Sequence, residues 1–323
     1  MRRSILRAIG AYLPERIVTN DDLALELDTS DAWIRERTGI GRRHIAAPGE
    51  LTSDLATRAA ERALAQAGIA PEAVDLIVVA TSTPDHTFPA TATAVQRKLD
   101  AGPGIAFDIQ AVCAGFAYAM ATADNFIKAG QAETALVIGA ETFSRILDWS
   151  DRSTCVLFGD GAGAVVLSAG ETTGTAQDQG ILATCLAADG RHYEHLWVDG
   201  GPSSTQTVGH LRMNGREVFR HAVTQLSAAA RRVLDDAGLA MADVDWLIPH
   251  QANRRIIDGV GKRLAIPAAK VVVTVEDHAN TSAASILLAL DHLQASGRLE
   301  RGDLLLMNAM GGGFAWGATL ARW

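Results

Sequence analysis

Cysteine is scarce in this sequence, and the spacing of the few cysteines excludes several classes of protein. The 323 residues contain three cysteines, Cys113, Cys155 and Cys185, and none of them belongs to a CxxC pair. No closely spaced set of Cys and His has the spacing of zinc ligands. An odd number of distant cysteines suits a reducing compartment better than a secreted disulfide scaffold. We therefore expect a cytoplasmic protein without a metal site.

Positive charge and long apolar runs are also in short supply. The chain has 29 Lys and Arg against 37 Asp and Glu, which argues against bulk binding to nucleic acid or to an anionic membrane. No apolar stretch reaches the roughly 20 residues that span a bilayer. The N-terminal run is broken at Arg7 and is too short for a secretion signal. The glycine-rich Phe158–Gly163 lacks the following helix of a dinucleotide-binding fingerprint, so we expect no such cofactor.

The sequence does contain an internal duplication. Residues 60–80 and 230–250 align without a gap at an offset of 170 residues. In each copy a helical pattern ends at a glycine, which is a common C-cap, and an acidic connector leads into an apolar run. Such continuous apolar runs are typical of strands buried on both faces. A weaker match at an offset of 167 residues pairs Gly130 with Gly297 and places Cys113 on Asn280.

The duplication predicts an α/β protein made of two similar halves, residues 1–172 and 173–323, each with a mostly buried sheet flanked by helices. Chance similarity between alanine-rich helices would explain the helices, but it explains poorly the ungapped run through connector and strand. A pseudo-twofold axis would bring equivalent helix starts and strand ends together at the middle. On that argument Cys113, His250 and Asn280 could converge.

Cys113 lies between a predicted strand over residues 105–109 and a largely apolar helix predicted over 114–128. A thiol there faces unpaired N–H groups and the positive end of the helix dipole, which lowers a thiol pKa and favours a nucleophilic thiolate. The same N–H groups could hold an oxyanion. From this position alone, a nucleophile and a buried structural cysteine are equally good interpretations. For Cys155 and Cys185 the structural interpretation is favoured.

Three further features suggest chemistry near the strand ends. His250 ends the apolar strand predicted over residues 244–249, and ligands of α/β sheets sit beyond the carboxyl ends of strands. Asn280 precedes an apolar helix and could be its N-cap, but Thr281 or Ser282 could cap equally well and leave Asn280 free. The glycines at 311–313 are more than a turn requires, so they indicate a backbone oxyanion donor as well as a turn.

Six motifs in order carry a resemblance to a known family, and they are Thr29–Ile34 with Arg37–Ile40, Ala111–Phe116, Phe158–Gly163, His250–Asn253, Asn280–Ser285 and Gly311–Gly317. Over nearly all of its length the chain resembles β-ketoacyl-acyl-carrier-protein synthase III, the initiating condensing enzyme of type II fatty acid synthesis. The resemblance implies a thiolase-like fold, with two duplicated βαβ-type halves and buried mixed sheets in a layered αβαβα arrangement. It also implies a homodimer that needs no metal or redox cofactor.

The resemblance further implies a two-step reaction. Cys113 would take the acyl group of an acyl-CoA, commonly acetyl-CoA, which is a substrate and not a cofactor. Malonyl-acyl-carrier protein would then lose CO₂, and His250 and Asn280 would stabilise the resulting enolate. The carbanion would attack the acyl group and give a 3-oxoacyl-carrier protein. The N–H groups of Cys113 and Gly312 would form the oxyanion hole.

The same resemblance assigns binding residues. For CoA these are Trp33 and Arg152 around the adenine, Arg37 and Thr38 at the nucleotide end, and Gly215, Ala252 and Asn253 along the pantetheine tunnel. Phe88 would close the acyl pocket of the partner subunit. Arg255 and Lys262 share one face of a predicted helix and would dock the acidic carrier protein, although a plain solvated face has the same pattern.

The sequence departs from the family beside the site, and rival interpretations stay open. Ala279 stands where glycine is usual and Met310 where phenylalanine is common, which bears on the starter acyl group more than on the reaction. One rival is a related condensing enzyme or acyltransferase of secondary metabolism that uses a longer or branched acyl-CoA. A second is a papain-like hydrolase using Cys113 and His250, and a third is an inactive partner subunit, which should lack the cysteine.

Overall fold

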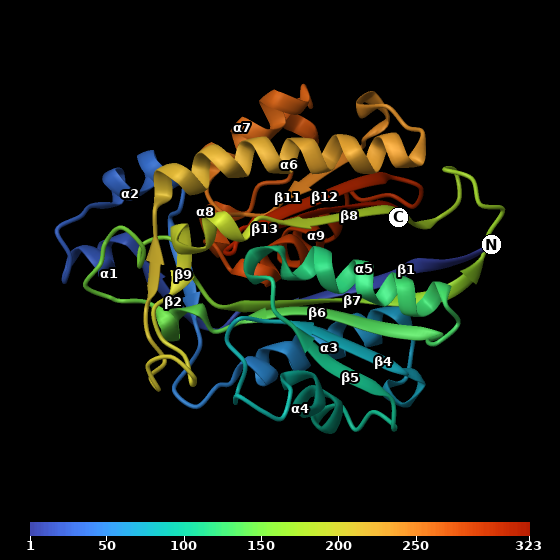
Figure 1. Ribbon diagram of the computed structural model, residues 1–323, viewed down its shortest axis with the longest axis horizontal. Coiled ribbons are helices and arrows are strands. Elements are labelled where there is room, and N and C mark those ends of the chain that lie inside the picture. The colour runs from blue at the N-terminus through green and yellow to red at the C-terminus, as the bar shows by residue number, and fades with distance from the viewer.

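The chain folds into two mixed β-sheets that alternate with layers of helices, as seen in the computed structural model, which describes residues 1–323 (Figure 1). Three helix layers alternate with the sheets: α3 (Thr52–Ala67) and α4 (Thr91–Lys98) outside the first sheet, α5 (Gly115–Lys128) and α9 (Ser285–Ala295) between the sheets, and α6 (Gly215–Ala237) and α7 (Arg254–Leu264) outside the second. This is the layered αβαβα arrangement of the predicted thiolase-like fold.

The two sheets repeat one strand order. The first runs β1 (Arg2–Tyr12), β7 (Gly161–Glu171), β6 (Thr134–Glu141), β4 (Leu76–Ala80), β5 (Ile105–Ile109), and the second runs β8 (Gly180–Ala188), β13 (Ala315–Arg322), β12 (Leu304–Gly311), β11 (Trp246–Pro249). The pairs β4–β6 and β11–β12 are parallel, and the pairs that follow them towards β1 and towards β8 are antiparallel. The edge pair β4–β5 of the first sheet is also parallel. The second sheet has no full strand equivalent to β5. Instead, Leu247 of β11 forms a single parallel bridge with Val271. The predicted division between residues 172 and 173 falls between β7 and β8.

Shorter elements connect the layers and cover one end of the molecule. They are β2 (Arg16–Thr19), α1 (Asn20–Ala24), α2 (Asp31–Thr38), β3 (Arg42–Ile45), β9 (Leu196–Val198), β10 (Leu211–Met213) and α8 (Val275–His278). Short 3-10 helices are η1 (Pro71–Ala73), η2 (Val112–Ala114), η3 (Phe143–Ile146), η4 (Gly190–His195), η5 (Met241–Asp243), η6 (Ala268–Lys270) and η7 (Ser282–Ala284). None of the helices combines the length and apolar character needed to cross a membrane.

The structure confirms the duplication at an offset of 170 residues. Helices α3 and α6 end at Gly68 and Gly238, whose φ angles are 65° and 68°, a left-handed conformation that glycine adopts without strain. In each half a 3-10 helix and a buried strand follow. The predicted correspondence of Cys113 with Asn280, however, is wrong.

The offset of 170 continues into the central helices. Val112 and Ser282 open η2 and η7 with the same φ of 47°, so Cys113 corresponds to Ala283. Helix α5 has 14 residues and α9 has 11. Because α9 is shorter by about one turn, the glycines after the helices, Gly130 and Gly297, are offset by 167, which misled the sequence alignment.

The core between the sheets is shared by both halves. One apolar cluster joins side chains of α5 and α9 to strands of both sheets, for example Phe116 and Leu287 with Val78 and Leu305. Two further clusters lie under the outer helices, one beneath α3 and α4 and one beneath α6 and α7. The starts of α5 and α9 are therefore held rigidly at the centre, where the predicted site residues lie.

Candidate active site

The three residues predicted to converge line one pocket at the junction of the halves. Cys113, His250 and Asn280 surround a cavity of about 70 Å³ whose lining is mostly apolar. Each is almost fully buried, with 4%, 3% and 5% of its surface exposed. Met310, one of the two departures from the family pattern, also lines this cavity. A nucleophile and two polar groups in an apolar pocket are typical of a site that excludes water from its chemistry.

Cys113 lies where the sequence placed it, but the expected thiol chemistry needs correction. The residue is in the middle of η2, two positions before α5 begins at Gly115. Burial raises the pKa of its thiol to about 12, while the nearby Ser282 hydroxyl lowers it and the negative charge of Glu141 raises it. The dipole was expected to lower this pKa, but desolvation of the thiolate outweighs it. The resting thiol therefore carries its proton.

His250 is held by a hydroxyl of the central helix. Its Nδ1 lies 2.6 Å from the Oγ of Ser285, the first residue of α9. That Oγ also accepts a 3.3 Å hydrogen bond from the backbone N–H of Gln251, so its own hydrogen is free to point at Nδ1. This arrangement puts the imidazole proton on Nε2, the other ring nitrogen. Burial lowers the pKa of His250 to about 3, so the ring is a neutral hydrogen-bond donor.

The side-chain amide of Asn280 is held in one orientation. Its Oδ1 accepts a 2.9 Å hydrogen bond from the backbone N–H of Ser282. The hydroxyls of Thr281 and Ser282, the alternative caps of the helix, have no hydrogen-bond partner. Because the oxygen of Asn280 is held by the backbone, its Nδ2 is the end of the amide that remains to donate into the pocket.

Two of the three glycines approach neighbouring backbone closely, and the third has a conformation that favours glycine. A methyl group on Gly311 would lie 2.6 Å from the backbone nitrogen of Cys113, and one on Gly312 would lie 2.5 Å from the carbonyl oxygen of Leu196. Gly313 has a φ of 123°, which side-chain-bearing residues rarely adopt. The N–H of Gly312 donates to no acceptor in the chain. The glycines are therefore needed for close approach, as expected, and one N–H stays available.

The predicted tunnel residues lie on the wall of the same pocket. Gly215, the first residue of α6, lines it together with Ala252 and Asn253. The side chain of Asn253 caps α7 by accepting a 3.0 Å hydrogen bond from the N–H of Ile256. Because the start of this helix is at the pocket, the cations on α7 lie within a few turns of it.

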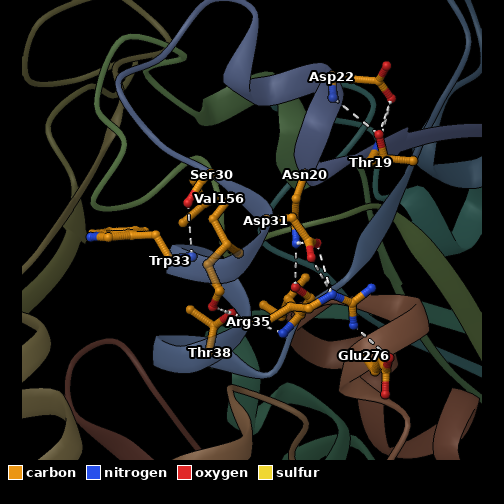
Figure 2. Close-up of polar contacts among 12 residues, drawn as sticks. Thr19, Asn20, Asp22, Ser30, Asp31, Trp33, Arg35, Thr38, Val156 and Glu276 are labelled. Atoms are coloured by element: carbon orange, nitrogen blue, oxygen red, sulfur yellow. Dashed lines mark hydrogen bonds and ion pairs between the residues drawn. The ribbon is translucent and has the colours of Figure 1, made fainter.

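Trp33 forms a second cluster with two arginines. The guanidinium carbon of Arg37 lies 4.4 Å from the centre of the Trp33 ring and that of Arg152 lies 5.1 Å from it. Helix α2 is fixed by Ser30, whose Oγ accepts the Trp33 N–H, and by Arg35, which bonds to Asp31 and Glu276 (Figure 2). The ring itself projects away from these polar contacts in the figure. A flat aromatic face with two cations suits a planar, anionic ligand.

Two predicted residues are not brought into either cluster. Thr38 is 5% exposed, and its hydroxyl donates to Ile34 O at 2.6 Å and accepts from Ile40 N–H at 3.0 Å. Its side chain therefore points into the fold and closes the end of α2. In this position it does not face a nucleotide bound at the surface. Phe88 is 82% exposed on the loop after β4 and does not line the pocket of its own chain.

Sequence reasoning missed two polar residues beside the site. Ser285 belongs to a quoted motif, but nothing in the sequence shows that it meets His250 across 35 residues. Glu141 ends the apolar strand β6 and is completely buried. A carboxylate that closes a run of buried residues was the available signal, and it is easily taken for the first exposed residue of a loop.

Comparison with protein families matches the two parts of the chain that carry these residues. The family model described as 3-oxoacyl-(acyl-carrier-protein) synthase III matches residues 107–190. The model of the C-terminal region of that enzyme matches residues 234–323. The first range contains Cys113 and the second contains His250 and Asn280.

Complete relatives and solved structures agree. The chain is 64% identical over 321 residues to β-ketoacyl-(acyl-carrier-protein) synthase III of Rhodospirillum centenum, covering 99% of each chain. The structure of 3-oxoacyl-(acyl-carrier-protein) synthase III from Aquifex aeolicus VF5 has a TM-score of 0.93 and 48% identity, covering 99% of this chain and 100% of that one. The priming β-ketosynthase of the R1128 polyketide pathway has a TM-score of 0.92 and 36% identity, covering 99% and 96%. With the duplicated halves and the buried thiol, imidazole and amide at their junction, the chain belongs to the 3-oxoacyl-(acyl-carrier-protein) synthase III family.

Proposed function

We propose that Cys113, His250 and Asn280 perform the decarboxylative condensation that initiates type II fatty acid synthesis, with an acyl-CoA as the acyl donor and malonyl-acyl-carrier protein as the acceptor. The single observation that carries the proposal is the convergence of these three side chains in one buried, mostly apolar pocket. Identity reaches 64% with full-length relatives named as synthase III, whereas the polyketide priming enzyme is 36% identical. Fatty acid synthesis is therefore favoured over a starter enzyme of secondary metabolism.

The first step is transfer of the acyl group to Cys113. The sulfur attacks the thioester carbonyl, and the tetrahedral oxyanion is stabilised by the N–H groups of Cys113 and Gly312. The free N–H of Gly312 and its position beside η2 support this role. The small cavity favours a short acyl group, of which acetyl is the smallest common example.

The second step is decarboxylation and carbon–carbon bond formation. As CO₂ leaves the malonyl group, negative charge grows on the thioester oxygen, and the Nε2–H of His250 and the Nδ2–H of Asn280 donate to it. Each donor is fixed by a hydrogen bond at the other end of its side chain. Ser285 holds Nδ1 of His250, and the backbone N–H of Ser282 holds Oδ1 of Asn280. Preorganised donors cost little reorganisation during the reaction. The steps use only groups of the chain, so neither a metal nor a redox cofactor has a role in them.

The substrates reach the pocket along the residues that connect it to the surface. We infer that the CoA adenine lies on Trp33 between Arg37 and Arg152, and that the pantetheine passes Gly215, Ala252 and Asn253. The cation–aromatic contacts and the lining of the pocket support this path. Thr38 is left out of it because its side chain is buried and hydrogen-bonded within the fold.

The carrier protein is proposed to dock on α7. Arg255 and Lys262 are exposed and form no ion pair, whereas their neighbour Arg254 pairs with Asp258 at 2.9 Å. Arg255→Glu should raise the KM for malonyl-carrier protein and leave acyl transfer from CoA unchanged. Arg7→Glu, an exposed change on β1, is the matched control. Equal carrier kinetics in both variants would remove this docking site.

We infer a homodimer through the open edge of the first sheet. Strand β5 has a neighbour on one side only, and Ile105 at its start is 37% exposed. Asp108 of β5 accepts hydrogen bonds from the first N–H groups of α4 at 2.7 and 2.8 Å, which ties the loop of Phe88 to this edge. An unpaired apolar edge is normally covered, and a second copy would bring its Phe88 along. A monomer in sedimentation equilibrium at micromolar concentration would contradict this inference.

One experiment tests the function most directly. The protein is incubated with a panel of acyl-CoAs, and intact mass and peptide mapping then locate the acyl group. Cys113→Ala should abolish loading, and Cys155→Ala, which removes another buried thiol, should not. Loading followed by 3-oxoacyl-carrier protein on addition of malonyl-carrier protein supports the proposal. Hydrolysis without condensation would instead favour a thiol hydrolase.

A further inference from the structure

A buried carboxylate without a cation lies beside the pocket. Glu141, the last residue of β6, is completely buried. Its Oε2 accepts from the Thr83 hydroxyl at 2.7 Å and the Thr81 hydroxyl at 3.3 Å, and the N–H of Ser82 is 3.0 and 3.2 Å from its two oxygens. Burying a charge costs several kcal/mol unless it is compensated. A neutral side chain could also accept these hydrogen bonds and hold residues 81–83 in place. Holding this loop therefore does not explain why the buried group is a carboxylate.

Ser282 opens η7, which packs both against η2, the turn of the thiol, and against β6, the strand of the carboxylate. Its hydroxyl is buried and makes no hydrogen bond, and it lowers the pKa of both Cys113 and Glu141. Its backbone is pinned by the hydrogen bond to Asn280. An orphaned hydroxyl held between an acid and a base is placed to pass a proton from one to the other.

The pseudo-symmetry shows that the fold does not require a carboxylate at this place. In the paired registers Leu76 meets Ala135 and Trp246 meets Leu305, so Glu141 of β6 corresponds to Gly311 of β12. The end of β12 packs against η2, and the end of β6 packs against η7, where a methyl on Gly139 would lie 2.3 Å from the carbonyl oxygen of Ala283. The same position therefore holds a glycine beside the thiol and a carboxylate beside Ser282.

The chemistry of the proposed first step needs a proton acceptor. The thiol pKa is raised to about 12 by burial, and the pKa of His250 is lowered to about 3 by the same cause. Burial also raises the pKa of Glu141 to about 7, while hydrogen bonds from Thr83, Ser82 and Thr81 and the nearby Ser282 hydroxyl lower it. Cys113 on η2 is the titratable group that Glu141 influences. An acceptor is most effective when its pKa lies near the working pH.

We propose that Glu141 stores the proton of Cys113 through the catalytic cycle and that the Ser282 hydroxyl relays it. The proposal rests on the function proposed above for Cys113. In acyl transfer the thiol gives its proton to Ser282 Oγ while Ser282 gives its own to Glu141. The thiolate forms a bond to the thioester carbon, the bond to the CoA sulfur breaks, and the CoA thiolate takes a proton from solvent.

Condensation then returns the stored proton. The enolate left by loss of CO₂ forms the new carbon–carbon bond, the bond from the acyl carbon to Cys113 breaks, and the sulfur leaves as a thiolate. Glu141 gives its proton back through Ser282, which restores the thiol and the carboxylate. The one proton that the decarboxylation consumes overall is the one that solvent supplied to CoA, so the cycle balances.

Single-turnover acylation of Cys113 by acetyl-CoA, followed from pH 5.5 to 9, tests the relay. The rate for the unchanged enzyme should rise with a midpoint near the pKa of Glu141 and then level. Glu141→Gln should slow acylation at pH 7 by about 10²-fold and remove the midpoint, so that the rate keeps rising with pH. Ser282→Ala should do the same, and the double variant should be no slower. Asp160→Asn, which changes another buried carboxylate, should keep the midpoint. A uniform loss of rate with an unchanged midpoint would make Glu141 merely structural and overturn the proposal.

A measurement on the unchanged enzyme keeps the proposal testable if Glu141→Gln does not fold. Infrared difference spectra in D₂O, before and after acetylation, should show the carbonyl stretch of one newly protonated buried carboxyl group. Cys113→Ala should lack this band. Acetylation of Cys113 without the band overturns the relay and leaves the function intact. Absence of acetylation contradicts the proposed function itself.

Discussion

The two 3-10 helices at the centre of the molecule, η2 and η7, have nearly the same backbone and different chemistry. Each opens with a residue at a φ of 47°, runs into a helix between the sheets and packs against the strand end of the opposite half. The first half places a thiol in this turn and the second places a hydroxyl, with an amide just before it. The duplication therefore provides two similar backbone turns, η2 and η7, and the site depends on their carrying different side chains.

The division of labour predicts the largest effects when the polar groups of the second half are removed. His250→Ala and Asn280→Ala should each lower the rate of condensation by about 10²- to 10³-fold, because each deletes one donor to the enolate oxygen. Loading of Cys113 from acyl-CoA should change by less than about tenfold, since those donors act in the second step. Rapid-quench measurement of the two steps checks this. Equal loss in both steps would show that the halves are not separated by function.

The internal symmetry of the sequence explains which parts of this site could be predicted. The convergence of Cys113, His250 and Asn280 was predictable because a repeated strand and helix pattern fixes where equivalent ends meet. The protonated state of the thiol was not, since a helix start is visible in a sequence and the depth of its burial is not. The placing of Cys113 opposite Ala283 was hidden because α9 is shorter than α5.

Polar partners were the hardest part to predict. The contacts of His250 with Ser285 and of Glu141 with Thr83 join residues 35 and 58 positions apart, and neither has a local pattern. The inward turn of Thr38 was likewise invisible, because a threonine near a helix end is equally common on the surface. Among the binding residues carried over by resemblance, the structure does bring Trp33 together with Arg37 and Arg152.

A second prediction concerns how closely β6 packs against η7. Gly139→Ala should lower the free energy of unfolding by about 1–3 kcal/mol, because the added methyl would lie 2.3 Å from the backbone oxygen of Ala283. The equivalent residue of the second half, Ala309, already carries a methyl and is fully buried. Gly190→Ala is the control, since a methyl there meets nothing within 4 Å. Urea unfolding followed by circular dichroism gives the comparison, and equal midpoints for both variants would contradict the close contact of β6 with η7.

A smaller effect is expected from the residue that holds the imidazole. Ser285→Ala should slow condensation by about tenfold, since the His250 ring would keep its place but lose the partner that fixes its proton on Nε2. Ser285→Thr retains the hydroxyl and should recover most of the rate, whereas loading of Cys113 should be unchanged in both variants. Ser296→Ala, which removes a hydroxyl after the end of the same helix, is the matched control. If Ser285→Ala condenses at the unchanged rate, the tautomer is set by another group.

The smallest effect distinguishes the halves by their response to acid. Burial lowers the pKa of His250 to about 3 and of His278 to about 4, and both residues belong to the second half. Above pH 6.5 both are neutral whether the chain is folded or not, so they contribute nothing there. As the pH falls below 6.5, these histidines bind protons in the unfolded chain but not in the folded one, until the folded pKa is reached. Acid therefore favours the unfolded chain over this range. Each histidine should therefore cost about 1.4 kcal/mol of stability by pH 5.5. His278→Gln should flatten the fall of unfolding free energy between pH 7 and 5.5 by that amount. If His278→Gln leaves the slope unchanged, the acid sensitivity does not arise from His278.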